Sequence, residues 1–146
     1  MSSLNRSDIQ QRIPHRDPFL WIDEVTELGD DRIVARKFLD PRLDVFRGHY
    51  PHFPILPGVL QCEAAFQAGA ILIAGTETLE NGLVPVVTRV NNVKFRRPIR
   101  PGETLEIEVW ITERLADAFF LSATVKVEGQ TAARLDFACK AAKLET

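Results

Sequence analysis

The chain has 146 residues, of which 45% are hydrophobic and 26% are charged, and its formal net charge is -2. This is the size and composition of one globular domain, so we expect residues 1–146 to form a single domain. The small negative charge argues against nucleic acid as a partner, because proteins that bind it carry a basic excess. No apolar run reaches the roughly 20 residues of a membrane-spanning helix, and the N-terminal stretch lacks the apolar core of a secretory signal. We therefore expect a cytoplasmic protein without membrane insertion.

The first third of the chain is predicted to form a short helix and two strands. The stretch SSLNRSDIQQRI fits an amphipathic helix capped near Asn5 or Ser7. FLWIDEVTEL and DRIVARKFL are predicted strands, and Gly29-Asp30-Asp31 between them favours a turn. In the segment that precedes them, Arg16 fits a structural role as well as a functional one, and His15 is expected to satisfy a local hydrogen bond.

A loop with three regularly spaced prolines comes next. Pro51, Pro54 and Pro57 recur at every third position and predict a stiff, extended path. Pro57 suits the first turn of a helix, and Gly58 after it lets a ligand approach the backbone. The unpaired N–H groups of a helix start can stabilise an oxygen that gains negative charge. A tight corner without further function accounts for these residues equally well.

The segment from Gly58 to about Thr76 is predicted to be a buried helix, because it has almost no polar face. Glu63 stands inside it, and Gln67 follows four residues later on the same face. Burial disfavours the charged form of a carboxylate, so Glu63 can hold a proton and act as a general acid. The alternative is a structural carboxylate that is satisfied by Gln67 or by a neighbouring arginine.

His49 is the natural base to accompany Glu63, since imidazole changes its charge near neutral pH. His52, in the same loop, is a rival candidate. Cys62 and Cys139 have neither metal-binding nor redox spacing, and the sequence offers no convincing metal cluster. We therefore predict no metal and no cofactor.

Strands are predicted for the remainder of the chain: LVPVVTRVNNVKF, ETLEIEVWITERL, AFFLSATVKVE and TAARLDFACKAA. Five or six strands with one long buried helix predict an α+β fold in which an antiparallel sheet curls around the helix. The uncovered side of such a helix needs a second subunit, so we expect a dimer.

Three blocks of the sequence resemble a known family in order and spacing. These blocks, RIPHRDPFLWIDEV, GHYPHFPILPGVLQCEAAFQ and VKFRRPIRPGETL, are similar to those of the β-hydroxyacyl-acyl carrier protein dehydratases of fatty-acid synthesis, the FabZ type. The resemblance implies the hotdog fold, a long central helix wrapped by a curved antiparallel β-sheet. It also implies a homodimer with active sites between subunits, and leaves open whether three such dimers assemble into a hexamer.

The resemblance implies the following roles. His49 matches the catalytic histidine that removes the α-proton of a 3-hydroxyacyl thioester, and Glu63 of the other subunit matches the acid that protonates the departing hydroxyl. Gly58 and Val59 offer backbone N–H groups to the thioester oxygen. We also assign Gln67, Phe53 and Leu56 to substrate binding. The product is a trans-2-enoyl thioester, in fatty-acid or related lipid or polyketide biosynthesis.

The chain departs from the family pattern beside the proposed base. The family usually has Gly-Asn where this chain has His52-Phe53, and it often has Met where Leu56 stands. These residues leave the reaction type unchanged and leave the acyl group open. Two alternatives remain, a hotdog acyl thioesterase and a non-catalytic acyl-thioester-binding subunit.

A basic group follows the first long strand after the helix. It consists of Lys94, Arg96, Arg97 and Arg100, in a chain that is acidic overall. Lys94 and Arg96 are expected on one strand face. Such a group suits an acidic carrier protein or the phosphate of its prosthetic arm, so we assign it to binding of an acyl carrier protein. A solvated strand end is the alternative.

Overall fold

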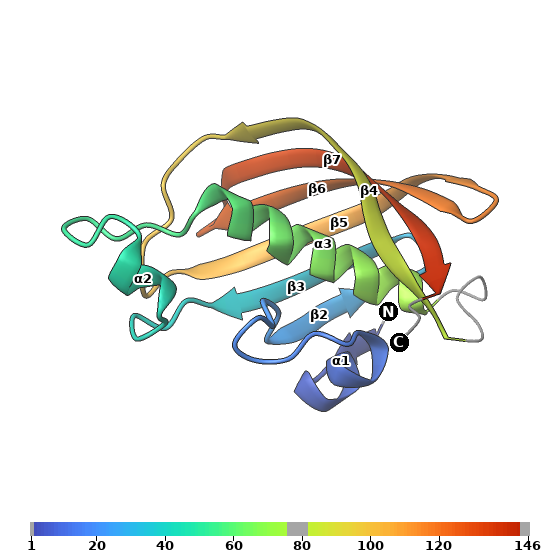
Figure 1. Ribbon diagram of the computed structural model, residues 1–146, viewed down its shortest axis with the longest axis horizontal. Coiled ribbons are helices and arrows are strands. Elements are labelled where there is room, and N and C mark those ends of the chain that lie inside the picture. Colours follow the sequence, from blue (N-terminus) through green and yellow to red (C-terminus); the bar gives the residue numbers. More distant parts are fainter. Residues whose placement is uncertain (1, 76–81, 144–146) are drawn as a thin grey trace.

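The computed structural model describes residues 2–75 and 82–143. In this part of the chain, one antiparallel sheet of seven strands curves around helix α3, with the strand order β1-β2-β3-β5-β6-β7-β4 (Figure 1). The elements are β1 (Ser2–Leu4), α1 (Arg6–Arg12), β2 (Glu24–Leu28), β3 (Arg32–Phe38), α2 (Val45–Gly48), α3 (Gly58–Ala74), β4 (Leu83–Phe95), β5 (Thr104–Leu115), β6 (Ala118–Val127) and β7 (Gln130–Lys143). The predicted hotdog architecture is confirmed, with one strand more than expected.

Helix α3 is buried on the concave side of the sheet, as its apolar composition predicts. Small residues allow the sheet to approach it closely: a Cβ at Gly69 would lie 2.9 Å from the ring of Phe137 on β7. The helix begins at Gly58, as expected, and ends at Ala74; Thr76, where we expected its end, lies outside the described residues. Because α3 is packed against the sheet, the backbone positions of Glu63 and Gln67 are set by the fold.

The N-terminal region differs from the prediction in two respects. Asn5 is confirmed as the cap of α1, where its side chain accepts from the Asp8 N–H, but the preceding residues form strand β1 beside β2 instead of helix. The predicted strand FLWIDEVTEL is shortened to β2, which begins at Glu24. None of the helices in the described part of the chain is long and apolar enough to cross a membrane.

Strand β4 forms one edge of the sheet, because it pairs with β7 alone. Four of its large apolar side chains are exposed: Val86, Val90, Val93 and Phe95. A long edge with free backbone groups and exposed apolar side chains is suited to association with another strand. This edge is a different surface from the uncovered side of the central helix, to which we assigned a second subunit.

Candidate active site

His49 follows α2 directly, and the loop that comes after it sets the state of its ring. Its Nδ1 lies 2.9 Å from the carbonyl oxygen of Ile55. A carbonyl oxygen accepts only, so Nδ1 carries the hydrogen and Nε2 keeps a free lone pair. His49 is half-buried, and the ring of Tyr50 packs against it with the centroids 4.7 Å apart. The loop therefore holds an imidazole whose Nε2 can accept a proton.

The start of α3 presents two backbone N–H groups without acceptors among the described residues. Pro57 caps the helix without a side-chain bond, and its carbonyl accepts from Leu60 and Gln61. The N–H groups of Gly58 and Val59 remain free, as the sequence analysis expected, and they can stabilise a developing negative charge.

Gly58 has a structural role as well. A Cβ at this position would lie 2.7 Å from Cζ of Phe95, whose ring rests against the helix start. The absence of a side chain is therefore needed for packing against β4. The neighbouring Val59 is 74% exposed and available to a ligand or a second subunit.

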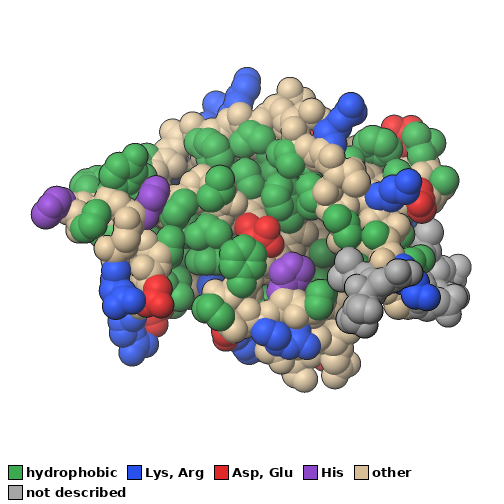
Figure 2. Space-filling model, viewed as in Figure 1, with side chains coloured by type: hydrophobic (Ala, Val, Ile, Leu, Met, Phe, Trp, Pro, Cys, Tyr) green, Lys and Arg blue, Asp and Glu red, His purple; other side chains and the backbone are tan. Residues whose placement is uncertain are grey.

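Glu63 lies on α3 in an apolar cavity of about 390 Å³. The cavity is bounded by the segment after α1, by α3, by β4 and by β7, and is lined by Ile13, Pro14, His15, Glu63, Phe66, Ala70, Val84, Pro85, Val86, Val87 and Cys139. The side chain of Glu63 is 22% exposed. Figure 2 shows an acidic and a histidine side chain next to each other within the hydrophobic surface over α3 and β4. A carboxyl in such surroundings is only partly accessible to solvent.

Gln67 fixes the orientation of Glu63. Its Nε2 donates to Oε2 of Glu63 at 2.9 Å and to the carbonyl oxygen of Phe19 at 2.9 Å, and its Oε1 accepts from the N–H of Trp21 at 2.7 Å. The side chain is fully buried and is absent from the lining of the Glu63 cavity. These contacts make Gln67 a support for Glu63, although we assigned it to substrate binding.

The neighbourhood of Glu63 also includes His15, which the sequence analysis misjudged. His15 Nε2 lies 3.8 Å from Oε2 of Glu63, and its Nδ1 is buried without a partner in the described structure. The predicted local hydrogen bond is therefore wrong. Arg16 is structural, since its guanidinium donates to the carbonyl oxygens of Gln10, Ile13 and His15.

Neither of the two cysteines is a nucleophile. Burial raises the pKa of the Cys139 thiol, which lines the cavity, to about 12. Burial also raises the pKa of the Cys62 thiol, which packs in the core. Both thiols therefore stay protonated at neutral pH.

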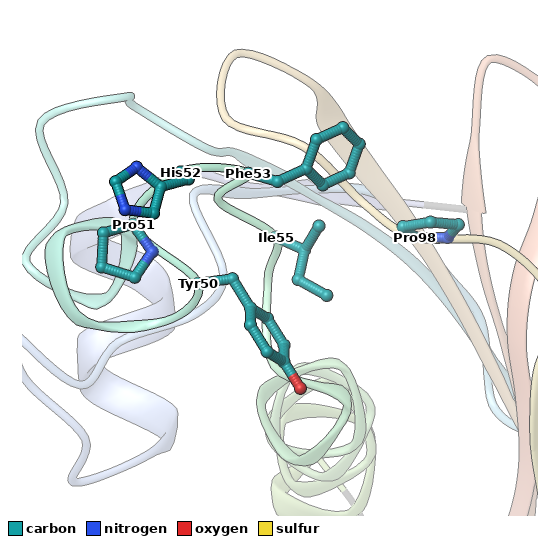
Figure 3. Close-up of a pocket in the computed structure, with 6 residues that line it drawn as sticks. All are labelled: Tyr50, Pro51, His52, Phe53, Ile55 and Pro98. Carbon is teal, nitrogen blue, oxygen red and sulfur yellow. The ribbon is translucent and has the colours of Figure 1, made fainter.

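The loop before α3 forms a second, apolar cavity of about 450 Å³, lined by Tyr50, Pro51, His52, Phe53, Ile55 and Pro98. Figure 3 shows the His52 ring beside Pro51 and turned away from Pro98. Phe53 is 54% exposed, so it is accessible to an acyl group as we expected, whereas Leu56 is buried in the core. The burial of Leu56 does not support the role in substrate contact that we assigned to it.

The predicted basic group does not act as a unit. Arg97 forms an ion pair of 2.7 Å with Glu103, and the guanidinium of Arg100 lies 3.9 Å from the centre of the Phe53 ring. Lys94 and Arg96 are exposed. Arg96 follows the last residue of β4, so the two do not share the strand as expected. Lys94, Arg96 and Arg100 remain available to an anionic partner, while Arg97 is engaged with Glu103.

The two proposed catalytic residues do not meet within one chain. The cavity that contains Glu63 does not include His49, and the described residues show no hydrogen bond or ion pair between them. This separation agrees with an active site to which two subunits contribute.

Sequence comparison places the chain among known dehydratases. The ApeI-like family model, described as ApeI dehydratase, matches residues 25–141. The 3-hydroxyacyl-[acyl-carrier-protein] dehydratase FabZ of Clostridium perfringens is 37% identical over 129 residues, covering 88% of this chain and 92% of the relative. The FabZ of Erythrobacter litoralis is 40% identical over 144 residues, covering 94% of both chains.

Solved structures agree with these matches. The dehydratase heterocomplex ApeI:P from Xenorhabdus doucetiae superposes with a TM-score of 0.64 at 27% identity, covering 80% of this chain and 93% of the neighbour. The protein smu.793 from Streptococcus mutans, bound to acetyl CoA, has a TM-score of 0.67 at 12% identity over 92% of this chain and 98% of the neighbour, and supports the fold alone. The chain therefore belongs to the FabZ-type 3-hydroxyacyl-[acyl-carrier-protein] dehydratase family of hotdog-fold enzymes.

Proposed function

We propose that the protein dehydrates a (3R)-3-hydroxyacyl thioester on acyl carrier protein to the trans-2-enoyl thioester, in the synthesis of fatty acids or related acyl chains. The observation that carries this proposal is the presence of a candidate base and a candidate acid in one fold. The contact of His49 Nδ1 with the Ile55 carbonyl leaves Nε2 of the ring without a partner among the described residues, and Glu63 lies in an apolar cavity. These are the base and the acid that an elimination of water requires.

The reaction divides between these groups as follows. His49 Nε2 removes the α-proton, and the electron pair of that C–H bond forms the new double bond as the β C–O bond breaks. The carboxyl of Glu63 gives its proton to the departing hydroxyl, so that water leaves and the carboxylate remains. The N–H groups of Gly58 and Val59 stabilise the thioester oxygen while negative charge develops on it. The proton held by His49 then returns to the carboxylate through solvent.

We further propose that two copies of the chain form a dimer along β4, and that each active site combines His49 of one copy with Glu63 of the other. The exposed valines and the free backbone edge of β4 support this arrangement. Light scattering on the purified chain measures whether dimers assemble into a trimer of dimers. A monomer in this measurement would favour the alternative that a different subunit completes the site.

The Glu63 cavity is suited to the acyl chain, because its walls are apolar side chains of α3 and β4. Phe53 and the second cavity lie beside the proposed base. They suit the thioester end of the substrate, which enters the site after the acyl chain. A series of acyl lengths, on carrier protein and on coenzyme A, measures which chains the site accepts.

Exposed basic residues support docking of an acidic carrier protein near the end of β4. We expect Arg96→Glu combined with Lys94→Glu to raise KM for the carrier-linked substrate about tenfold while leaving a short thioester mimic unaffected. Lys140→Glu is the control, because Lys140 is exposed and pairs with Val86 at the other end of β4. Equal effects on both substrates would remove carrier docking from this surface.

The shared site is tested by mixing two inactive variants. His49→Asn keeps an N–H for the Ile55 carbonyl but removes the base, and Glu63→Gln removes the acid. Each alone should lose at least about 99% of turnover. After denaturation and joint refolding, random dimers should recover about a quarter of the wild-type activity, because half of them contain one intact site.

The readout is the ultraviolet absorbance of the enoyl thioester. No recovery in refolded dimers would show that the two residues do not act across the interface, and full activity in either single variant would remove that residue from the mechanism. A cytoplasmic location also stays a prediction, and cell fractionation measures it.

A further inference from the structure

We propose that His15 is a positioning residue, which holds the carboxyl of Glu63 so that its proton resides on Oε1. The inference rests on the proposed function, because it concerns the acid of that reaction. It starts from the proximity of two side chains that are 48 positions apart in the sequence.

The two oxygens of Glu63 have different surroundings. Oε2 accepts from Nε2 of Gln67 at 2.9 Å, and Nε2 of His15 faces the same oxygen at 3.8 Å. Oε1 has no hydrogen-bond partner in the described part of the chain. An oxygen that already accepts hydrogen bonds is the poorer site for a proton, so the proton of the neutral carboxyl resides on Oε1.

The surroundings of the His15 ring favour a hydrogen on Nε2. Its Nδ1 is buried and has no partner in the described structure. A hydrogen on Nδ1 would therefore be buried without an acceptor, which costs free energy. The neutral ring with its hydrogen on Nε2 avoids this penalty and directs its donor at Glu63.

The distance of 3.8 Å exceeds a hydrogen bond, whose N–H···O separation is about 3.0 Å. A displacement of about 1 Å, within the range of an ordinary side-chain adjustment, brings the two atoms to hydrogen-bond distance. The backbone of His15 is itself restrained, because Arg16 donates to its carbonyl oxygen at 2.7 Å. The donor is therefore kept close to the carboxyl.

Among the described residues, no other charged side chain besides Glu63 lines this cavity. The Cys139 thiol stays protonated, since burial raises its pKa to about 12. Arg12 and Arg16 direct their guanidinium groups at backbone carbonyl oxygens, and the residues of β4 that line the cavity are apolar. A donor beside the one that Gln67 supplies has a large effect on a carboxylate in such a poorly polar site.

The test compares two replacements of His15. His15→Phe keeps an aromatic ring without a donor, and His15→Gln restores an N–H near the position of Nε2 but cannot be charged. The carboxyl carbon signal of Glu63, assigned by its loss in Glu63→Gln, is followed by NMR as a function of pH. This signal does not depend on turnover.

In His15→Phe the transition of the Glu63 carboxyl signal should move to higher pH than in the wild type, because the charged form has lost a donor. The high-pH limb of the turnover profile should move in the same direction by the same amount, and His15→Gln should behave as the wild type in both. Thermal denaturation verifies that the variants are folded.

An identical titration of Glu63 in the wild type and in His15→Phe would overturn the proposal, as would a failure of His15→Gln to restore the wild-type curve. If the wild type lacks dehydratase turnover while the titration still responds to His15, the proposed function fails and the positioning of Glu63 stands.

Discussion

Replacement of Gln67 by leucine tests the support beneath the catalytic acid. Gln67→Leu removes three hydrogen bonds, to Trp21, Phe19 and Glu63. The Trp21 N–H is buried and would lose its acceptor, at a cost of about 1–3 kcal/mol; the Phe19 carbonyl is partly accessible and adds less. We therefore expect a loss of about 3 kcal/mol, or about 10 °C in Tm for a chain of this length.

Gln61→Leu is the matched control. Gln61 is also a buried glutamine of α3, but its Oε1 has no partner among the described residues, so its replacement should change Tm by less than about 3 °C. Differential scanning calorimetry measures both variants, and the enoyl assay should show at least a tenfold loss of kcat for Gln67→Leu. Two equal Tm values would refute the reasoning, because they would show that the three bonds of Gln67 contribute nothing.

Three further predictions concern groups outside the catalytic pair. Cys139 should react with a thiol reagent at pH 8 at least a hundredfold more slowly in the native protein than in guanidinium chloride, because burial raises its pKa to about 12; equal rates would contradict this. Thr124→Val should leave Tm unchanged or raise it, because the buried hydroxyl of Thr124 has no partner among the described residues. A fall of about 5 °C in Tm would show that the hydroxyl has a hydrogen-bond partner. Hydrogen bonds from Asn92 and Ser122 lower the pKa of Asp136. Asn92→Gly should therefore destabilise the protein at pH 7, and the Tm difference from the wild type should vanish as acid protonates Asp136. A Tm difference that is independent of pH would exclude this contribution of Asn92.

Much of the fold follows from local patterns. The absence of a polar face predicts that α3 is a buried helix. The glycine before β4 and the proline after it predict the bounds of the strand, Leu83 and Phe95. Glu63 was identified as a candidate because a carboxylate stands out in an apolar helix, whereas the choice of His49 over His52 came from the family resemblance.

The remaining features depend on contacts between distant residues. The segment before β2 is not a strand, because the Trp21 N–H donates to a side chain 46 positions away instead of to a neighbouring strand. The proximity of His15 and Glu63 arises in the same way, from packing of the segment after α1 over α3. Likewise, the sequence alone does not distinguish Arg97 from its basic neighbours, because its ion pair with Glu103 is visible only in the structure. Charge and spacing identify candidates, while the three-dimensional arrangement selects among them.

The open edge at β4 has a practical consequence for anyone who handles the protein. If each reaction centre borrows groups from two chains, specific activity becomes a function of dilution, because separated chains contain only halves of a centre. Turnover measured at nanomolar enzyme would then underestimate the capacity of the crowded cell, and a plot of rate against enzyme concentration would curve upward before it becomes linear.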